Sequence, residues 1–309
     1  MQLEPSSGPA GLPNSSQWNI KNPKGEIYHI QAAWPLAWDS SSKKGQEVPV
    51  FYVLDANAYF FGTVEAVRRN GVLPGGKDGI VIGIGYPPSR FPFDGRRNYD
   101  LTPPSPHYAP PLDADGKAFA GLHGGATEFL EFVVKTVREL LFTDEGPFSK
   151  DNVSMEVLVG HSYGGLCTLH ALFTRATPFQ AFVAISPSIW WNDKFLLSEQ
   201  DAFLERGVEK GVGLGQPQSK PLLFLAYGSL EQDPIRAPTW TDEQYAKQVA
   251  WYHSMSLGKH TEAMYGKLKD SESFDTLRFR VYEGEDHLSV AMNGISWAIS
   301  SIVDLARFG

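Results

Sequence analysis

Residues 157–165, with the sequence V-L-V-G-H-S-Y-G-G, constrain the fold of this chain more than any other segment. An apolar run ends there in a G-x-S-x-G motif and passes into residues 166–173, which can form a buried helix. A strand, a tight turn and a helix in this order are the context of a nucleophile elbow, in which Ser162 sits on strained backbone and Gly160 and Gly164 leave it room. The bare motif also occurs in ordinary glycine turns, and the strand before it and the helix after it favour the catalytic interpretation, for which the rest of the chain must supply a base, an acid and an oxyanion hole.

The order of apolar segments predicts an α/β fold. Continuous apolar runs are typical of parallel strands buried on both faces, and apolar residues at i, i+3 and i+4 are typical of helices packed on a sheet. We expect strands over 48–55, 79–86, 179–186, 222–227 and 277–282, and helices over 58–70, 127–142, 195–206, 242–257 and 290–308. This is the pattern of an α/β-hydrolase with a mostly parallel central sheet flanked by helices.

The remaining segments complete the expected domain organisation. A flexible lead is expected over 1–17, followed by a single domain over 18–309 that begins with a strand at 26–34. The proline-rich insertion 87–121 interrupts the alternation of strands and helices. Insertions of that length inside a compact domain are commonly functional, and we expect this one to form a small cap.

Composition argues against several classes of function. The chain has 309 residues and a formal net charge of -8, without a run rich in lysine and arginine, so neither a nucleic acid nor a membrane is expected as a partner. No apolar run reaches the roughly 18 residues of a membrane helix, and the N-terminus lacks the features of a secretory signal. Cys167 is the only cysteine, so no internal disulfide forms and a cytoplasmic protein is expected. No cofactor is implied, no cysteine cluster or HxxEH-type run predicts a metal site, and the oligomeric state is not predicted.

Candidates for the base and the acid follow the last two strands. In α/β-hydrolases the triad is ordered Ser, then Asp or Glu, then His, each at the carboxyl end of a strand. His287 comes directly after the strand 277–282, where an imidazole can take up the Ser162 proton and return it to the leaving group. Glu231 and Asp233 follow the strand 222–227, and Glu231 is favoured because it comes first and has the longer reach. Alternatively, both carboxylates only cap a helix or face water, which leaves a Ser–His dyad.

The oxyanion hole is predicted from topology. In the elbow arrangement, the N–H of the residue after the nucleophile, Tyr163, stabilises the developing charge together with an N–H from the loop after the strand 48–55. Ala56 or Asn57 would supply the second donor, because both lie in that loop. Backbone donors have little side-chain signature, so this prediction depends on the fold alone.

Several short motifs resemble one branch of the α/β-hydrolases. They are V-L-D-A-N at 53–57, G-I-G-Y at 83–86, R-R-N-Y-D-L-T-P at 96–103, G-G-A at 124–126, G-H-S-Y-G-G at 160–165, A-I-S-P-S at 184–188 with Trp190 and Trp191, and G-E-D-H at 284–287. In this order they resemble the esterase D-like family, in particular its bacterial enterobactin and bacillibactin esterases and fungal siderophore esterases. The resemblance implies a cytosolic serine esterase that cleaves a macrocyclic or linear oligoester, such as an iron-loaded fusarinine-type siderophore. Some relatives work with a Ser–His dyad, which leaves the role of Glu231 open.

Candidate substrate-binding residues lie in the insertion and after two of the strands. They are Arg90, Arg96, Arg97, Tyr99, Trp190, Trp191 and Trp240. A ferric tris-catecholate is an anion that the arginines can attract, whereas a ferric tris-hydroxamate is neutral and needs aromatic walls. Alternatively, the arginines pair locally with Asp94 or Asp100 and the tryptophans are buried under the cap.

Other functions also remain open at this point. The same acyl-enzyme serves a hydrolase of polyketide oligolactones or an acyltransferase, because the difference lies in the substrate and in whether water or another alcohol reaches the intermediate. A hydrolase fold that binds a ligand without catalysis is the alternative of another class. For the enzymes the expected partner is a small-molecule ester, and if that ester is a siderophore its iron arrives with the substrate; the non-catalytic fold would bind a ligand or another partner.

Overall fold

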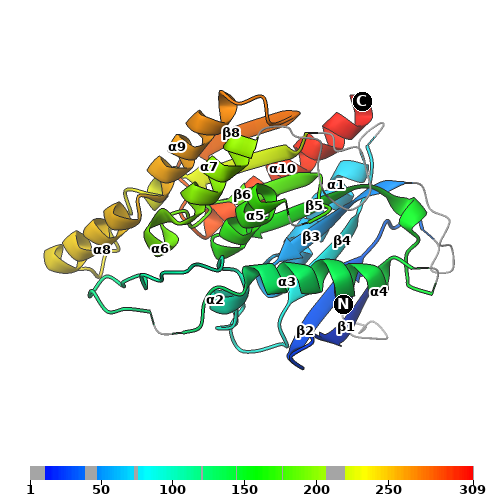
Figure 1. The fold of residues 1–309 in the computed structure, drawn as a ribbon, viewed down its shortest axis with the longest axis horizontal. Helices are drawn as coiled ribbons and strands as arrows, with labels where there is room; N and C mark the ends of the chain where they lie inside the picture. The colour runs from blue at the N-terminus through cyan, green and yellow to red at the C-terminus, as the bar shows by residue number, and fades with distance from the viewer. Residues whose placement is uncertain are drawn as a thin grey trace, which may run out of the picture.

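The computed structural model describes residues 11–38, 47–72, 76–119, 121–143, 145–175, 177–206 and 220–308 (Figure 1). The molecule is built on an eight-stranded sheet in the order β1-β2-β4-β3-β5-β6-β7-β8. β2 is antiparallel to its neighbours β1 and β4, and every pair from β4 to β8 is parallel. The strands are β1 (Ser15–Lys21), β2 (Ile27–Ala33), β3 (Val48–Leu54), β4 (Ile80–Gly85), β5 (Val153–His161), β6 (Ala181–Ile185), β7 (Leu222–Gly228) and β8 (Thr276–Tyr282). The predicted α/β-hydrolase sheet is confirmed.

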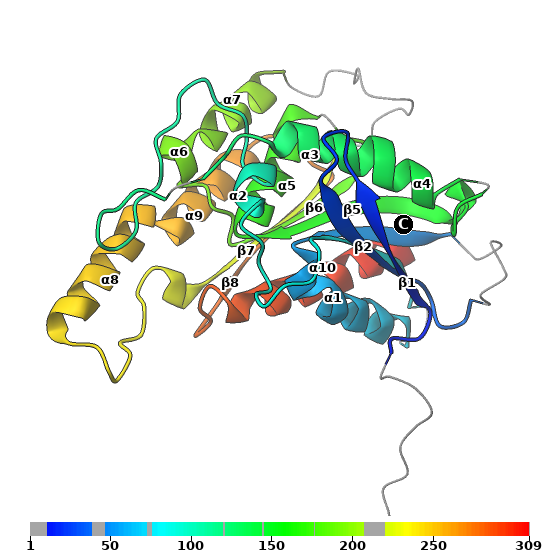
Figure 2. The same cartoon turned by 90° about the horizontal axis from the view of Figure 1, so that it is seen from below.

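Helices cover both faces of this sheet (Figure 2). α1 (Ala56–Gly71) and α10 (Ser289–Phe308) pack together on one face. The other face carries α3 (Ala126–Phe132), α4 (Glu139–Leu141), α5 (Tyr163–Thr174), α7 (Leu196–Arg206) and α9 (Leu257–Lys269). α8 (Asp242–Met255) projects beyond the end of the sheet and has no buried residue. None of the helices in the described part of the chain is long and apolar enough to cross a membrane.

β3 shows why these sequences form a central sheet. All of its residues are buried, and successive side chains point into opposite cores. Val50, Tyr52 and Leu54 contact the core under α3 and α5, whereas Phe51 and Val53 contact the core under α1 and α10. A strand covered on both faces needs an apolar residue at every position, because its side chains alternate between those faces. The strands predicted from continuous apolar runs are all confirmed.

Three segments differ from the sequence-based expectation. Residues 15–17 of the expected lead begin β1, and residues 1–10 lie outside the described part of the chain. The helix expected over 242–257 ends at Met255, where Ser256 takes a left-handed conformation with φ 44°, and α9 follows. The helix expected over 127–142 contains a wider π-type turn over Val133–Arg138, after which Leu140 is exposed. The extra residue in that turn rotates the following side chains about the axis, so the apolar spacing no longer marks one face.

The described part of the insertion, which we call the cap, is hydrogen-bonded to two neighbouring helices. Its regular structure includes α2 (Arg97–Asp100) and a bridge between Leu112 and Ala118. Asn192, in α6 (Trp191–Lys194), accepts a hydrogen bond from the N–H of Ala109 at 2.8 Å. Trp251 of α8 donates from Nε1 to the carbonyl of Leu112, also at 2.8 Å. Both views show the insertion as an extended loop that reaches α8 (Figures 1 and 2).

Candidate active site

Ser162 occupies a sharp turn between β5 and α5. Its φ of 58° and ψ of -117° are rare for a residue with a side chain and persist only where the surroundings hold them. A Cβ at Gly160 would lie 2.1 Å from the carbonyl oxygen of Gly164, so only glycine fits there. A Cβ at Gly164 would meet no atom closer than 3.5 Å, so the expectation that both glycines make room holds for Gly160 alone. The second tight position is Gly165, whose Cβ would lie 3.1 Å from the carbonyl oxygen of Ile185.

Gly160→Ala is expected to destabilise the fold severely. The added methyl group collides with the backbone of α5, which cannot move without disrupting the elbow, so the free energy of unfolding should fall by more than about 3 kcal/mol. Urea denaturation measures the loss. Gly164→Ala is the matched control and should change stability by less than about 1 kcal/mol, because a helix favours alanine over glycine. Equal losses in the two variants would contradict the steric explanation.

Side chains from the ends of neighbouring strands meet at Ser162. His287 follows β8, and its Nε2 lies 3.0 Å from Oγ of Ser162. Glu231 follows β7, and its Oε2 lies 2.5 Å from Nδ1 of His287. The structure therefore brings the three predicted residues into one relay from hydroxyl to imidazole to carboxylate. In such an arrangement a serine can pass its proton to the imidazole as it attacks a carbonyl carbon.

The surroundings of Glu231 distinguish it from Asp233. Glu231 is 3% exposed, and its Oε1 accepts hydrogen bonds from Oγ of Ser186 at 2.5 Å and from the N–H of Gly228 at 2.7 Å. These bonds fix the carboxylate so that its other oxygen faces His287. Asp233 is exposed and lies 3.2 Å from Nε2 of His253 instead. Of the two candidate acids, the structure places Glu231 at the imidazole.

A second histidine, His161, packs against His287. The ring centroids are 4.5 Å apart, and Nδ1 of His161 lies 2.9 Å from the hydroxyl of Tyr59. Burial lowers the pKa of His161 well below its usual value, and the proximity of the His287 imidazole acts in the same direction, so the ring of His161 is neutral at pH 7. Sequence reasoning missed this residue because it treated the position before Ser162 only as the variable residue of G-x-S-x-G.

The predicted oxyanion donors lie at two helix starts on the same edge of the sheet. Tyr163 is the first residue of α5, and Ala56 and Asn57 are the first residues of α1. Because β3 and β5 are adjacent parallel strands, the helices that follow them begin side by side. The first N–H groups of a helix have no acceptor within it. The side chain of Asn57 exchanges two hydrogen bonds with the backbone of Tyr86, at 2.9 and 2.8 Å, so this side chain is already engaged.

The candidate arginines differ in their surroundings. Arg97 donates two hydrogen bonds to Asp55, at 2.9 and 2.8 Å, so its partner is neither of the acids expected from the sequence. Arg96 is the residue that pairs with Asp94, at 3.4 Å. Arg90 is exposed. Local pairing, the alternative to ligand binding, is therefore the arrangement found for Arg96 and, with a different acid, for Arg97.

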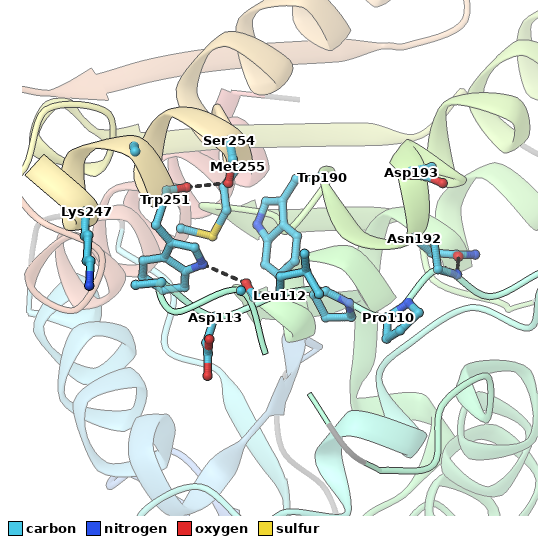
Figure 3. A pocket seen from close by; sticks show the side chains of 15 residues that line it. Pro110, Leu112, Asp113, Trp190, Asn192, Asp193, Lys247, Trp251, Ser254 and Met255 are labelled. Carbon is cyan, nitrogen blue, oxygen red and sulfur yellow. Dashed lines mark hydrogen bonds between the residues drawn. The ribbon is translucent and has the colours of Figure 1, made fainter. Parts of the chain in front are cut away.

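Two cavities lie near the elbow. The cap cavity, of about 470 Å³, lies between the insertion and α8, and its walls include Pro110, Leu112, Trp190, Asn192, Lys247, Trp251 and Met255 (Figure 3). The elbow cavity, of about 250 Å³, has walls that include Arg97, Tyr108, His123, Tyr163 and Trp191. The ring of Trp190 lies 6.1 Å from that of Tyr163, so the two cavities flank the residue after the nucleophile.

The candidate aromatic residues divide between these cavities and other places. Trp190 lines the cap cavity, and Trp191, which is buried, lines the elbow cavity. Tyr99 borders neither and donates to Glu128 at 3.0 Å. Trp240 borders neither and lies beside Tyr245, with ring centroids 6.5 Å apart. Of the candidate aromatic residues in the described part of the chain, only the paired tryptophans line these cavities, and of the candidate arginines Arg97 lines the elbow cavity.

Comparison with known proteins agrees with this geometry. Residues 25–248 match the Esterase family. A siderophore enterobactin esterase of Emericella nidulans is 36% identical over 96% of this chain and 96% of its own length. A siderophore triacetylfusarinine C esterase of Aspergillus fumigatus is 37% identical over 93% of this chain and 92% of its own. The solved structure of the siderophore hydrolase EstA from Aspergillus nidulans matches with a TM-score of 0.90 at 34% identity, covering 99% of both chains. This chain therefore belongs to the esterase family, within the α/β-hydrolase fold.

Proposed function

We propose that the protein is a serine esterase that cleaves the ester bonds of an iron-loaded siderophore, with a fusarinine-type complex as its preferred substrate. The observation that carries this proposal is the relay from Ser162 through His287 to the buried Glu231, with contacts of 3.0 and 2.5 Å. We infer siderophore esters as the substrates because two relatives are siderophore esterases, one for enterobactin and one for triacetylfusarinine C. A cytoplasmic location is part of the proposal and rests on the single cysteine in the sequence.

The proposed reaction has two halves. Ser162 attacks the ester carbonyl carbon while Nε2 of His287 takes up its proton, and Glu231 holds the imidazole in the required tautomer and stabilises the imidazolium. The N–H of Tyr163 and an N–H of the β3–α1 turn stabilise the oxyanion. His287 then gives its proton to the leaving alcohol, and an acyl-enzyme remains on Ser162. A water molecule then attacks the acyl carbon while His287 takes up its proton; the bond to Oγ of Ser162 breaks, His287 returns the proton to that oxygen, and the acid is released.

The cap cavity favours a neutral ligand over an anion. Its charged wall residues are two carboxylates, Asp113 and Asp193, and one ammonium, Lys247. The Nζ of Lys247 also lies 3.5 Å from Glu243, which offsets its charge. A ferric tris-catecholate carries several negative charges, so the excess of carboxylates around the cavity repels it. A ferric tris-hydroxamate is neutral and is not repelled. The faces of the two wall tryptophans suit such a neutral complex (Figure 3).

Trp251→Ala is expected to raise KM for ferric triacetylfusarinine C by about tenfold and to leave the hydrolysis of p-nitrophenyl acetate unchanged. The indole forms one wall of the cap cavity, and its Nε1 bonds to the carbonyl of Leu112. Steady-state kinetics on the two esters measure the difference. Trp251→Phe keeps an aromatic wall without the N–H, so it should retain a low KM if the wall is what binds. An unchanged KM in the alanine variant would exclude the cap cavity as the substrate site.

Rates on two iron complexes test the proposed substrate. Purified enzyme is incubated with ferric triacetylfusarinine C or with ferric enterobactin, and the released acids are followed by mass spectrometry. We expect kcat/KM to be higher for the neutral complex by about tenfold or more. Faster cleavage of the catecholate would contradict the charge argument. Cleavage of neither complex, with small esters still hydrolysed, would contradict the siderophore assignment and leave the serine chemistry intact.

A further inference from the structure

The turn that carries the proposed donors Ala56 and Asn57 begins at Asp55. This residue precedes the first turn of α1 in a left-handed conformation with φ 52° and ψ 45°, and its carbonyl accepts hydrogen bonds from Ala58 at 2.9 Å and Tyr59 at 3.3 Å. A residue with a side chain keeps such a conformation only where its surroundings hold it. The direction of the first N–H groups of α1 therefore depends on what holds Asp55.

Arg97 holds Asp55 through its side chain. Nε and Nη2 of Arg97 bond to the two carboxylate oxygens at 2.9 and 2.8 Å. The pair is buried, with 14% of the arginine and 1% of the aspartate side chain exposed. Burial alone would lower the pKa of Arg97, but the carboxylate of Asp55 raises it, so the guanidinium stays charged. Two parallel hydrogen bonds fix the plane of the carboxylate as well as its distance.

The same two side chains also contact the elbow. The guanidinium carbon of Arg97 lies over the ring of Tyr163, 5.2 Å from its centroid. The Oδ2 of Asp55 lies 3.5 Å from the position that a Cβ at Gly164 would take. Tyr163 carries the first proposed oxyanion donor, and Asp55 begins the turn that carries the second. One buried ion pair thus touches both segments that form the proposed oxyanion hole.

We propose that Asp55 and Arg97 are positioning residues that hold the β3–α1 turn in register with Tyr163, so that both oxyanion donors point at one atom. The inference rests on the proposed serine esterase function. Arg97 lies in the insertion, so its ion pair with Asp55 links the insertion to the turn that carries one of the proposed oxyanion donors. A positioning role lowers kcat for every ester, whereas direct binding of an anionic substrate by Arg97 changes KM for that substrate.

The test uses the full chain and p-nitrophenyl acetate, a small neutral ester that offers no anion to Arg97. We expect Arg97→Met to lower kcat by about 10- to 100-fold with KM unchanged, because a displaced oxyanion donor loses its interaction in the transition state. Phenylboronic acid forms a tetrahedral anion on an active serine, so its inhibition constant should rise by a similar factor. Arg97→Lys should restore little, since an ammonium cannot bind both carboxylate oxygens and also lie flat on the ring.

Two further variants separate positioning from general destabilisation. Arg138→Met is the matched control, because Arg138 forms a similar buried pair with Glu156 nearer the other end of β5, at 2.7 Å. It should lose stability in thermal melts but keep the wild-type kcat. The double variant Asp55→Asn/Arg97→Met leaves no uncompensated buried charge, so it should melt higher than Arg97→Met. Its kcat should remain low, because the turn is still not held.

A wild-type kcat in Arg97→Met would overturn the positioning role. A raised KM with an unchanged kcat would overturn it too and make Arg97 a substrate-binding residue. An equal fall of kcat in Arg138→Met would reduce the effect to lost stability. Ser162→Ala in the same assay keeps the two proposals apart: if that variant is inactive, the serine esterase assignment stands even where the positioning role fails.

Discussion

Ser162→Ala is expected to lower kcat for every ester substrate by about four orders of magnitude or more, with the fold unchanged. The substitution removes the oxygen that lies 3.0 Å from Nε2 of His287 and that would form the bond to the acyl group. The residual rate reflects what the oxyanion hole and substrate binding provide without a nucleophile. Hydrolysis of p-nitrophenyl acetate and of ferric triacetylfusarinine C measures the loss, and circular dichroism verifies the fold.

Ser188→Ala is the matched control for that variant. Its Oγ lies 3.4 Å from Oγ of Ser162, so it is a second hydroxyl in the same small region. Because the proposed relay does not use Ser188, its removal should leave kcat nearly unchanged. An inactive Ser188→Ala together with an active Ser162→Ala would show that the nucleophile had been assigned to the wrong serine.

Glu231→Gln is expected to lower kcat by about 10³- to 10⁴-fold with little change in KM. The amide oxygen of glutamine would keep the hydrogen bonds from Ser186 and Gly228, which turns the NH₂ group toward Nδ1 of His287. His287 must then accept at Nδ1 and carry its proton on Nε2, the wrong tautomer for a base that faces Ser162. Steady-state kinetics across the pH range measure the effect.

Asp233→Asn is the control for the choice of acid. Asp233 is exposed and pairs with His253, away from the relay, so its neutralisation should leave kcat unchanged. Full activity in Glu231→Gln would mean that Ser162 and His287 suffice as a dyad. The same loss in both variants would point instead to the net charge of the region.

The central fold and the relay could be predicted because their causes are local or follow from chain order. A strand buried on both faces, such as β3, must be apolar throughout, so it can be predicted from its own sequence without knowledge of its neighbours. The elbow at Ser162 has a steric signature, and Gly160 has no room for a side chain. His287 and Glu231 follow from the positions of the last two strands, since parallel strands end at the same edge of a sheet.

What could not be predicted depends on contacts between distant segments. Within the described residues β1 is an edge strand that pairs with β2 alone, and its exposed residues give it no apolar run. The wide turn over Val133–Arg138 changes which residues face the core, and no local residue type marks it. Arg97 forms its ion pair with Asp55, 42 positions earlier in the chain, rather than with an acid of its own segment. In each case tertiary packing selects the arrangement.

Covalent labelling of the nucleophile tests the serine esterase assignment most directly. A fluorophosphonate reacts with a serine that an adjacent base activates, so the native enzyme is treated with diisopropyl fluorophosphate, digested and mapped by mass spectrometry. We expect a single modified residue, Ser162, with loss of esterase activity in proportion to labelling and no labelling of His287→Ala over the same period. Modification of another residue, or an enzyme that still hydrolyses esters with Ser162 fully modified, would contradict the assignment.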